Sequence, residues 1–528
     1  MEKHKTGNKT KISDRRRFFE IMEVLSKYGL SYIFSRFRIR KHPKDRGVRV
    51  RKALEELGTT FIKLGQMLST RYDLLPVDII LELTKLQDDV PPISFVEYQQ
   101  VLQQAYSSVQ EVFLYIEPNP LGAASIAQVH RALLLDGSEV VVKVRRPGIP
   151  EQVDRDIQVL KGIASFAQHF PLFRDFDLQG IVEDFGMGVR REMNFLHEAK
   201  ALERFNRAFR LNDTVFAPVP VMEHCREDVL VMQYIPGIKF SELIAKSAKE
   251  LPFQVDVPKM VEQGADAMFQ QSFVLGFLHG DPHPGNLIAT RDGKLFFIDF
   301  GQVNLIDKHT RHFLMEMVFA ITRRDAELMT QILIEHFPMK NEDFFCTDVK
   351  GLFSEYYGKP LSEFNMSEMV LEVFKLIRKY HIQVPSQLLL MGKIILMIES
   401  IARRLDPGFN AIAFTENYLQ KRWPSLFADR LQELKEMALW KFLMLPRRWN
   451  DLEKFFESGK LKMDIQASRV ERLLYGLRLS VNSLAVSIII AALLISINNF
   501  KNQTIAYLAV VLLGVFLVYE ILFGERRG

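Results

Sequence analysis

Four polar side chains near the middle of the chain have the types and spacing needed to hold a phosphate group. His279 and Asp281 begin the segment HGDPHPGN, Asn286 ends it, and Asp299 opens an Asp-Phe-Gly triplet. Two short apolar runs between them flank an Asp-Gly pair, which is a strong hairpin signal. The hairpin would bring one carboxylate close to a nucleophile, while the amide oxygen and the second carboxylate hold Mg²⁺ against phosphates.

The order of these residues is similar to the kinase pattern H-x-D-x-x-x-x-N followed by D-F-G. We interpret Asp281 as the catalytic carboxylate that orients the nucleophile or accepts its proton, and Asn286 and Asp299 as metal ligands. Either half alone also fits an ordinary turn or the end of a strand. Both halves in the correct order favour phosphoryl transfer.

A lysine within a valine-rich run is the next candidate. Residues 139–144 read EVVVKV, and Lys143 is costly to bury there unless it meets an anion. The run is similar to the kinase V-A-I-K strand, whose lysine binds nucleotide phosphates and a helical glutamate. Glu198, in the helical segment 191–205, is the predicted partner, and its distance along the chain predicts an insertion in the small lobe. A solubilising lysine on an edge strand is the alternative.

Two loops are expected to enclose the nucleotide. Ala123, Ala124 and Ser125 lie where a kinase has its glycine-rich phosphate cover, and their Cβ atoms restrict how closely the backbone can approach a phosphate. Gln233 and Tyr234 follow a predicted strand and lie at the expected hinge, where backbone groups would meet adenine.

A polar cluster interrupts the helical region of residues 50–87, which is expected to break at Pro76. Lys63, Gly65 and Gln66 form a K-x-G-Q motif, for which a solvated helix face is the alternative. Glu192 and Asn194 lie shortly before Glu198 and are expected to contact a group outside the nucleotide site. Glu192 also fits an ordinary acid near a helix end.

Composition limits the remaining possibilities. The chain has 528 residues, 48% of them hydrophobic and 25% charged, and a net charge of +5, which does not indicate a nucleic-acid partner. The two cysteines lack metal-ligand spacing, so a reducing compartment is expected. Basic residues concentrate near the N-terminus, where they suit either anionic lipid or a solvated tail, and no secretory signal is expected.

Two apolar runs near the C-terminus, residues 479–497 and 504–523, are each long enough to cross ~30 Å of hydrocarbon. Basic residues flank the pair, which places both flanks and the kinase-like body on the cytoplasmic side of the cell inner membrane. A buried hairpin is the alternative. Residues 303–478 are expected to be helical throughout.

The motifs K-x-G-Q, LTKLQDDVPP, PLGAASIAQVHRA, HGDPHPGN and DFG together resemble those of the UbiB family of atypical kinases. The resemblance implies an α+β, two-lobed protein-kinase-like fold with a helical N-terminal extension and two C-terminal transmembrane helices. It also implies that Lys63 and Gln66 fold over the active site and meet an E-x-D element. That element reads Glu192-Met193-Asn194 here, so its second carboxylate is missing.

The family resemblance also implies a function. It points to a membrane-anchored kinase or ATPase that binds ATP and Mg²⁺, supports ubiquinone biosynthesis, and meets membrane lipid, isoprenoid quinone precursors or the enzymes that process them. No A-P-E segment for a peptide platform follows Gly301. A small-molecule kinase similar to aminoglycoside or choline kinases and a nucleotide-binding pseudokinase scaffold remain alternatives. The sequence leaves open the phosphoryl acceptor, the quinone and the oligomeric state.

We expect six segments along the chain. They are a basic segment (1–52), a helical extension with K-x-G-Q (53–110), a small lobe with an insertion (111–237), a large lobe (238–410), a helical connector (411–478) and a membrane hairpin (479–523).

Overall fold

The structure is a computed structural model that describes residues 16–29, 45–72, 74–86, 90–169, 177–246, 248–323, 325–337, 342–356, 366–380, 382 and 384–421. The chain divides into two compact units, Met1–Ala428 and Asp429–Gly528, and every described residue belongs to the first. The two apolar runs expected to cross a membrane lie outside the described residues. Within the described part of the chain, no helix is both long and apolar enough to span a bilayer.

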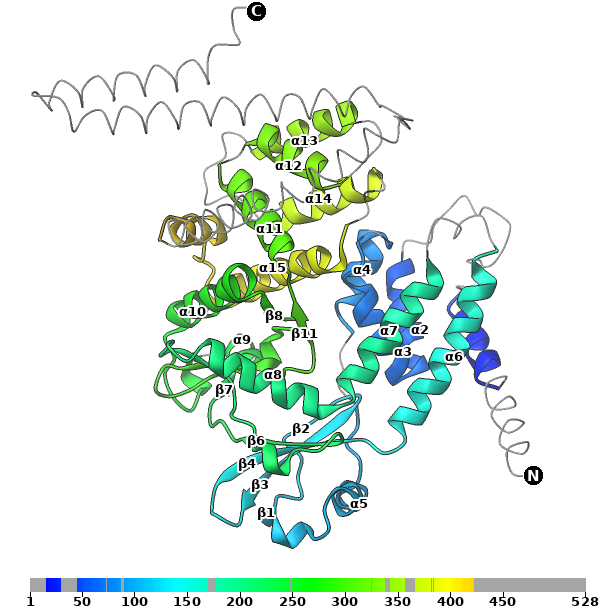
Figure 1. The fold of residues 1–528 in the computed structure, drawn as a ribbon, viewed down its shortest axis with the longest axis vertical. Helices are drawn as coiled ribbons and strands as arrows, with labels where there is room; N and C mark the ends of the chain where they lie inside the picture. The colour runs from blue at the N-terminus through cyan, green and yellow to red at the C-terminus, as the bar shows by residue number, and fades with distance from the viewer. Residues whose placement is uncertain are drawn as a thin grey trace, which may run out of the picture. The chain divides into compact units, whose positions relative to one another are not determined.

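An antiparallel sheet forms the small lobe (Figure 1). Its strands run in the order β1-β3-β4-β6, with β2 beside β3; they are β1 (Phe113–Ile116), β2 (Gly122–Ala123), β3 (Ala127–Leu134), β4 (Glu139–Arg145) and β6 (Val229–Gln233). The predicted valine-rich strand is confirmed as β4. Side chains alternate across a strand, so Val142 and Val144 are buried against α5 (Phe95–Ala105), while Lys143 points to the other face.

Helices from two distant parts of the sequence pack beside this sheet. They are residues 16–27, α2 (Arg46–Leu57), α3 (Thr59–Leu68), α4 (Val77–Leu83), α6 (Ile149–Ala167) and α7 (Leu178–Glu192). They share one apolar core, and Figure 1 shows α6 and α7 alongside α2 and α3. Arg17 Nε donates to Asp156 at 2.7 Å across this group. The insertion expected between Lys143 and Glu198 is therefore the α6–α7 pair, and it supports the K-x-G-Q helix α3.

Local chain geometry divides the N-terminal helices. The expected break is confirmed at Pro76, which precedes α4. A second break, which the sequence did not predict, separates α2 from α3 at Gly58, whose φ of +91° suits glycine. Helix α2 also runs across residue 52, where the sequence had suggested the end of a segment.

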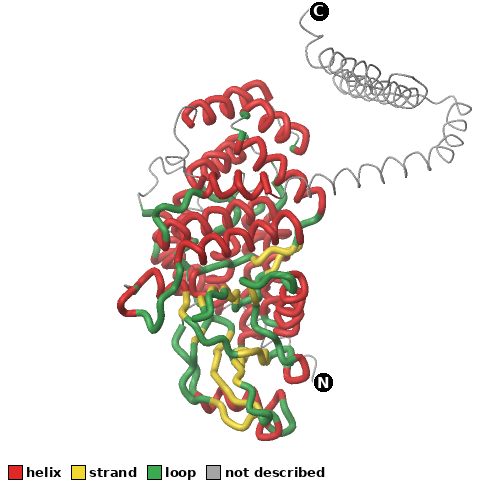
Figure 2. The backbone as a smooth tube through the Cα atoms, turned by 90° about the vertical axis from the view of Figure 1, so that its left-hand side faces the viewer, coloured by secondary structure: helices red, strands yellow, loops and turns green. Residues whose placement is uncertain are grey.

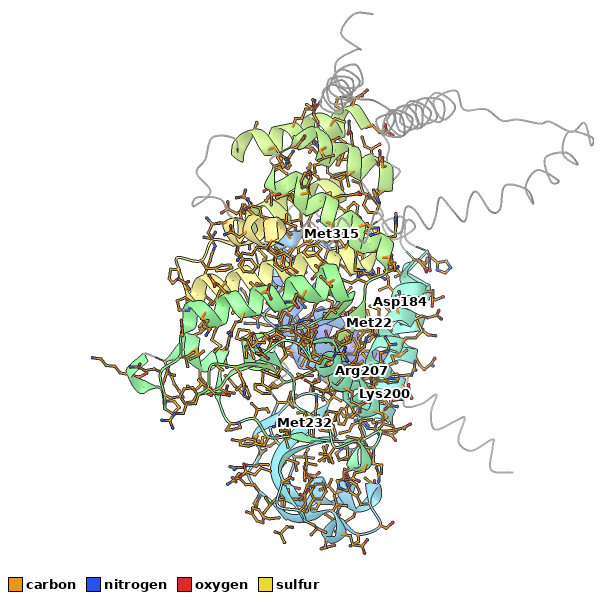
Figure 3. All side chains as sticks on the ribbon, turned by 60° about the vertical axis from the view of Figure 1, so that its left-hand side comes forward. Met22, Asp184, Lys200, Arg207, Met232 and Met315 are labelled. Atoms are coloured by element: carbon orange, nitrogen blue, oxygen red, sulfur yellow. The ribbon has the colours of Figure 1, made fainter. Side chains whose placement is uncertain are left out.

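Helix α8 (Phe195–Ala208) connects the two lobes. It buries Phe195, Leu202 and Phe205 at helical spacing, while Lys200 and Arg207 are exposed (Figure 3). The same helix carries Glu198. The packing of the apolar face of α8 into the main core therefore fixes the position of Glu198.

The large lobe contains the predicted hairpin. β9 (Leu287–Ala289) pairs antiparallel with β10 (Leu295–Phe297), and Gly293 turns between them with φ of +77°. Two short strands flank this pair in one sheet, β5 (Val215–Phe216) and β7 (Ile238–Lys239).

A separate two-stranded pairing joins β8 (Phe277–His279) to β11 (Val303–Leu305). The expectation of helix throughout residues 303–478 is therefore wrong at its start. Residues 303–305 form a strand because their backbone groups pair with the segment that leads into HGDPHPGN.

Helices make up the rest of the large lobe, as Figure 2 shows in red. They are α9 (Phe240–Ala245), α10 (Val257–Phe269), the π-helical turn η6 (Gln270–Leu275), α11 (Lys308–Thr322), α12 (Ala326–His336), α13 (Glu342–Tyr356), α14 (Met366–Lys379) and α15 (Ser386–Leu405). Short 3₁₀ turns lie at η2 (Val109–Glu111), η4 (Met222–His224), η5 (Ala248–Glu250) and η7 (Pro284–Asn286). The apolar faces of the large-lobe helices continue the core that underlies the β9–β10 hairpin.

Candidate active site

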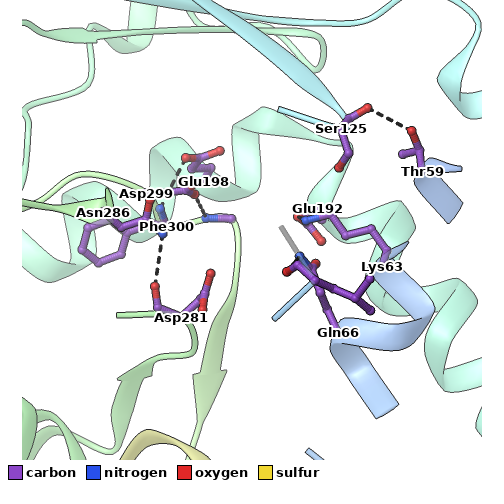
Figure 4. A network of polar contacts seen from close by, with 12 residues as sticks. Thr59, Lys63, Gln66, Ser125, Glu192, Glu198, Asp281, Asn286, Asp299 and Phe300 are labelled. Carbon is purple, nitrogen blue, oxygen red and sulfur yellow. Dashed lines mark hydrogen bonds and ion pairs between the residues drawn. The ribbon is translucent and has the colours of Figure 1, made fainter. Parts of the chain in front are cut away.

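One lysine and two acids meet where the small and large lobes face each other, and Figure 4 shows the two acids, Glu198 and Asp299. Lys143 Nζ donates to both carboxylate oxygens of Glu198, each at 2.9 Å, and lies 3.5 Å from Asp299 Oδ1. Its side chain is 14% exposed, and that of Glu198 is 2% exposed. Strand β4, helix α8 and the segment after β10 therefore place three charges at one point.

Mutual interactions decide the charge of each group in this cluster. Burial disfavours the Lys143 ammonium, but the charges of Asp299 and Glu198 outweigh it and raise the lysine pKa. Burial raises the pKa of Glu198 to about 7, against the opposing effect of Lys143. Burial also opposes ionisation of Asp299, yet Lys143 and the Gly301 N–H hold that pKa well below its usual value. Asp299 therefore stays ionised and, at 43% exposed, can still reach a ligand.

The hairpin brings the HGDPHPGN loop to this cluster. Ile298 N donates to the Asn286 carbonyl at 3.0 Å, and Asn286 Nδ2 donates to the Asp281 carbonyl at 3.2 Å. His279 is buried, and its Nδ1 accepts from Asp281 N at 3.2 Å. Burial lowers the pKa of His279, so the neutral ring fixes the backbone that presents Asp281. Asp281 and Asn286 are thus oriented by contacts within their own loop.

A cavity of about 400 Å³ opens between these elements. The predicted site residues that line it are Lys63, Ala123, Ala124, Ser125, Lys143, Glu192, Gln233, Tyr234, Asp281, Asn286 and Asp299. The volume lies in the usual range for small-molecule sites.

Four predicted residues do not line this cavity. Glu198 lies behind Lys143, which it holds in place. Gly65 is buried, and a Cβ built there would lie 2.3 Å from a Leu86 methyl group, so it permits close packing of α3. Gln66 Nε2 donates to the Leu86 carbonyl at 3.4 Å. Asn194 caps α8 through its Oδ1, which accepts from a backbone N–H at 3.1 Å.

The alanine-rich loop is held by contacts that the sequence did not predict. Arg146 Nε donates to the Ala124 carbonyl at 2.8 Å, and its Nη2 donates to the Pro91 carbonyl at 2.7 Å. Thr59 Oγ1, at the start of α3, donates to the Ser125 carbonyl at 3.4 Å. The loop is therefore tied to both the sheet and the extension. In the sequence, Arg146 is marked only as a basic residue shortly after Lys143.

The K-x-G-Q helix reaches the cavity through Lys63. Its Nζ donates to Glu192 Oε1 at 2.5 Å, and the two side chains are 7% and 19% exposed. Figure 4 shows this pair across from Asp281 and Asp299. The extension thus closes the side of the cavity that faces the HGDPHPGN loop.

The polar residues fit a magnesium–nucleotide complex. Mg²⁺ in such sites binds one or two protein oxygens and completes its shell with phosphates and water. Asn286 and Asp299 offer two oxygens at the cavity wall, next to Lys143. No cluster of three or more His, Cys, Asp or Glu that could hold a metal ion occurs among the described residues.

Three further polar residues line the cavity without having been predicted: Lys239, Glu242 and Gln302. Lys239 ends β7 and Glu242 lies in the first turn of α9, beyond the hinge, while Gln302 follows the D-F-G triplet. None belongs to a motif, so only the folded chain identifies them.

Two features define a protein-kinase-like fold. A lysine on β4 pairs with a glutamate on α8, and a hairpin joins a catalytic-type loop to the D-F-G triplet. The family model described as the ABC1 atypical kinase-like domain matches residues 85–333, and the UbiB helical domain matches residues 349–410. These matches cover both lobes and the helices beyond them.

Individual proteins give the same picture. The "Probable protein kinase UbiB" of Cellvibrio japonicus is 31% identical over 84% of this chain and 85% of its own length. A Clostridium pasteurianum protein described as an uncharacterized protein in the hydrogenase 1 5′ region is 31% identical over 91% of each chain. The solved complex of Rv3197 with erythromycin from Mycobacterium tuberculosis has a TM-score of 0.51 at 23% identity, covers 69% of this chain and 93% of its own, and supports the fold alone. The chain belongs to the UbiB family of atypical kinases.

Proposed function

We propose that this protein binds Mg-ATP and acts as a membrane-associated kinase or ATPase that supports ubiquinone or related quinone-lipid biosynthesis. The observation that carries the proposal is the position of Lys143, 2.9 Å from Glu198 and 3.5 Å from Asp299, in a cavity that Asp281 and Asn286 also line. Phosphoryl transfer depends mainly on positioning and on neutralising charge, and this arrangement supplies both.

Lys143 binds the nucleotide phosphates in this proposal. Glu198 holds the ammonium from behind, so the lysine loses little side-chain freedom when the phosphates bind. The alanine-rich loop covers the phosphates, and the backbone beside Gln233 and Tyr234 meets the adenine ring. Arg146 fixes the cover by holding the Ala124 carbonyl.

Asp281 orients the attacking hydroxyl or water and accepts its proton. Asn286 and Asp299 would hold Mg²⁺, which would supply positive charge against the phosphates. The low pKa of Asp299, held down by Lys143 and the Gly301 N–H against burial, keeps this carboxylate ready to bind a cation at neutral pH.

The extension and the C-terminus suggest what the reaction acts on. Lys63 and Glu192 close the cavity where a peptide would otherwise approach, which supports a substrate other than a protein. The apolar runs of residues 479–497 and 504–523 would hold the protein at the cell inner membrane with its kinase-like body in the cytoplasm. Membrane-borne isoprenoid quinone precursors, or the enzymes that process them, are the partners that we propose.

Asp299→Asn tests the assignment. The amide keeps the shape and can still accept from the Gly301 N–H, but it removes the negative charge that the cation needs. We expect the wild-type protein to gain thermal stability with Mg-ATP and to lose that gain with EDTA, and the variant to show little Mg-dependent gain. ATP hydrolysis, measured with and without lipid vesicles, should fall in parallel.

Asp292→Asn is the matched control because Asp292 is exposed in the turn of the same hairpin. It should respond to Mg-ATP as the wild type does. Full stabilisation of Asp299→Asn by Mg-ATP would contradict the proposed metal site. Nucleotide binding by the wild type without any turnover, with or without vesicles, would favour a scaffold instead.

A further inference from the structure

A second hollow, of about 530 Å³, lies on the surface where α8 meets the segment that leads into HGDPHPGN. It is lined by the α8 side chains Lys200, Glu203, Arg204 and Arg207, and by Leu275 of η6 and Phe277 of β8. Among the described residues, none lines both this hollow and the cavity that contains Lys143. The hollow is therefore a separate place in the fold, which the proposed function does not use.

The three basic side chains of the hollow belong to one face of α8. Arg204 and Arg207 follow Lys200 by four and seven positions, a spacing that places side chains on the same side of a helix. All three are exposed, and Lys200 and Arg207 lie beside each other in Figure 3. The hollow therefore gathers three cations on one wall.

These cations lack acidic partners. In the part of the chain that the structure describes, Lys200, Arg204 and Arg207 form no hydrogen bond or ion pair. Glu203 is the one acid among the described residues that line the hollow, and it forms no ion pair either. Like charges three or four positions apart destabilise a helix, so a bound anion would relieve a repulsion that the chain leaves uncompensated.

Phe277 fixes the position of one of the cations. The guanidinium carbon of Arg204 lies over the Phe277 ring, 4.9 Å from its centre, which is the geometry of a cation–π contact. Phe277 is 2% exposed and belongs to the main core, so its ring is a rigid support. A guanidinium stacked on a ring keeps the N–H groups at its edge, where they can donate in pairs to an oxyanion.

The charge and the size of the hollow indicate the class of its ligand. Three cations against one acid leave a surplus of two positive charges. A phosphate monoester carries about −1.5 to −2 at pH 7, whereas a carboxylate carries a single negative charge. The volume lies in the range of small-molecule sites, and Leu275 and Phe277 offer apolar contacts. A phosphate group attached to an apolar organic group matches both properties.

We propose that this hollow binds a ligand with a phosphate group. The phosphate oxygens accept hydrogen bonds from the three cations of α8, and the organic part contacts Leu275 and Phe277. The ligand is either a soluble organic phosphate or the headgroup of a membrane lipid.

The position of the hollow gives such a ligand a structural role. Glu198, which holds Lys143, lies two residues before Lys200 on α8. His279, which contacts the backbone of Asp281, lies two residues after Phe277 on β8. A ligand held by both elements therefore joins the helix of the Lys143–Glu198 pair to the strand that leads into the HGDPHPGN loop.

Phenyl phosphate is the probe for this site because it combines a phosphate group with a small apolar ring. Its dissociation constant should be measured on the full chain, reconstituted in phosphatidylcholine vesicles, in EDTA and without nucleotide. Arg204→Gln and Arg207→Gln each remove one cation and keep a long side chain that favours helix. Each should weaken binding about ten-fold or more, because a charge-assisted hydrogen bond is lost. Arg207→Lys keeps the charge and should retain most of the affinity.

Two controls locate the bound phosphate. Arg155→Gln removes an exposed arginine of α6, outside the hollow, and should bind phenyl phosphate as the wild type does. Lys143→Met should do the same, because Lys143 belongs to the other cavity. Loss of binding in Lys143→Met but not in Arg204→Gln would place the phosphate in the nucleotide cavity and overturn the inference.

Phosphatidic acid distinguishes the two sources of the phosphate, because its headgroup is a phosphate monoester. If a lipid headgroup is the ligand, vesicles with phosphatidic acid should weaken phenyl phosphate binding more than phosphatidylglycerol vesicles of equal surface charge. If the ligand is soluble, the two kinds of vesicle should give equal affinities.

Two results would overturn the inference and leave the proposed function intact. One is equal affinity for phenyl phosphate in the wild type, Arg204→Gln and Arg207→Gln. The other is a folded wild-type protein that binds Mg-ATP but does not bind phenyl phosphate. Loss of Mg-ATP binding alone, with phenyl phosphate still bound through the arginines, would instead overturn the proposed function and support the second site.

Discussion

Two lysine–glutamate pairs face the same cavity, and they differ in what they connect. Lys143 and Glu198 join β4 to α8, and the glutamate is almost completely buried. Lys63 and Glu192 join α3 of the extension to the last residue of α7, and here the lysine is the more buried partner. The first pair belongs to the kinase-like body, whereas the second attaches an added element to it.

One short turn, between α7 and α8, positions the glutamates of both pairs. Glu192 and Glu198 lie on either side of Asn194, which ends the insertion and caps α8. The turn therefore sets the position of Glu198, which holds Lys143, and of the extension together. We expect loss of the first pair to affect nucleotide binding, and loss of the second to affect mainly the attachment of the extension.

Lys143→Met should have the largest effect. It removes the cation nearest Asp299, so Mg-ATP affinity should fall about one-hundred-fold or more. The fold should survive because Glu198, whose pKa burial raises to about 7 even beside Lys143, can take up a proton when the lysine is lost. Calorimetric titration with Mg-ATP measures the change.

Lys294→Met is the control for this variant, since the Lys294 side chain is 43% exposed, pairs with Asp292 and lies in the turn of the β9–β10 hairpin. An affinity for Mg-ATP in Lys143→Met that equals the control would show that the first pair has only a structural role.

Glu192→Gln should have an intermediate effect, mainly on stability. The amide keeps the shape but removes the negative charge that the Lys63 ammonium contacts at 2.5 Å, which should lower the free energy of unfolding by about 1–3 kcal/mol. Mg-ATP affinity should stay within about two-fold because Lys143 keeps its own partner. Urea unfolding and nucleotide titration together distinguish the two effects.

Glu183→Gln offers a matched comparison on the same helix. Glu183 pairs with Lys161 at 3.1 Å, but both side chains are exposed, so its loss should change stability by less than about 1 kcal/mol. If Glu192→Gln weakened Mg-ATP binding as strongly as Lys143→Met, the two pairs would not have separate roles.

Asn194→Asp should have the smallest effect. Aspartate is as good an N-cap as asparagine, so stability should change by less than about 0.5 kcal/mol, while Asn194→Ala should cost about 1 kcal/mol. Urea unfolding measures both. A gain above about 1 kcal/mol in the aspartate variant would mean that the new carboxylate has joined the Lys63–Glu192 pair rather than only capping α8.

Short-range patterns accounted for much of the site. The Asp-Gly pair predicted the β9–β10 hairpin, and the valine run predicted β4, because turn geometry and side-chain alternation are local properties. The same local rules missed β11, whose partner β8 lies more than twenty residues earlier in the chain. Pairing between distant segments has no signal in a single short window.

The sequence by itself determined which side chains are candidates for the chemistry, their order, and the family to which the chain belongs, because those properties depend on residue type and spacing. Only the tertiary structure decided that α6 and α7 support the extension and that Arg146 holds the alanine-rich loop. Each of these contacts joins segments far apart in the chain, and burial in a shared core brings them together. No local pattern of residues specifies such packing.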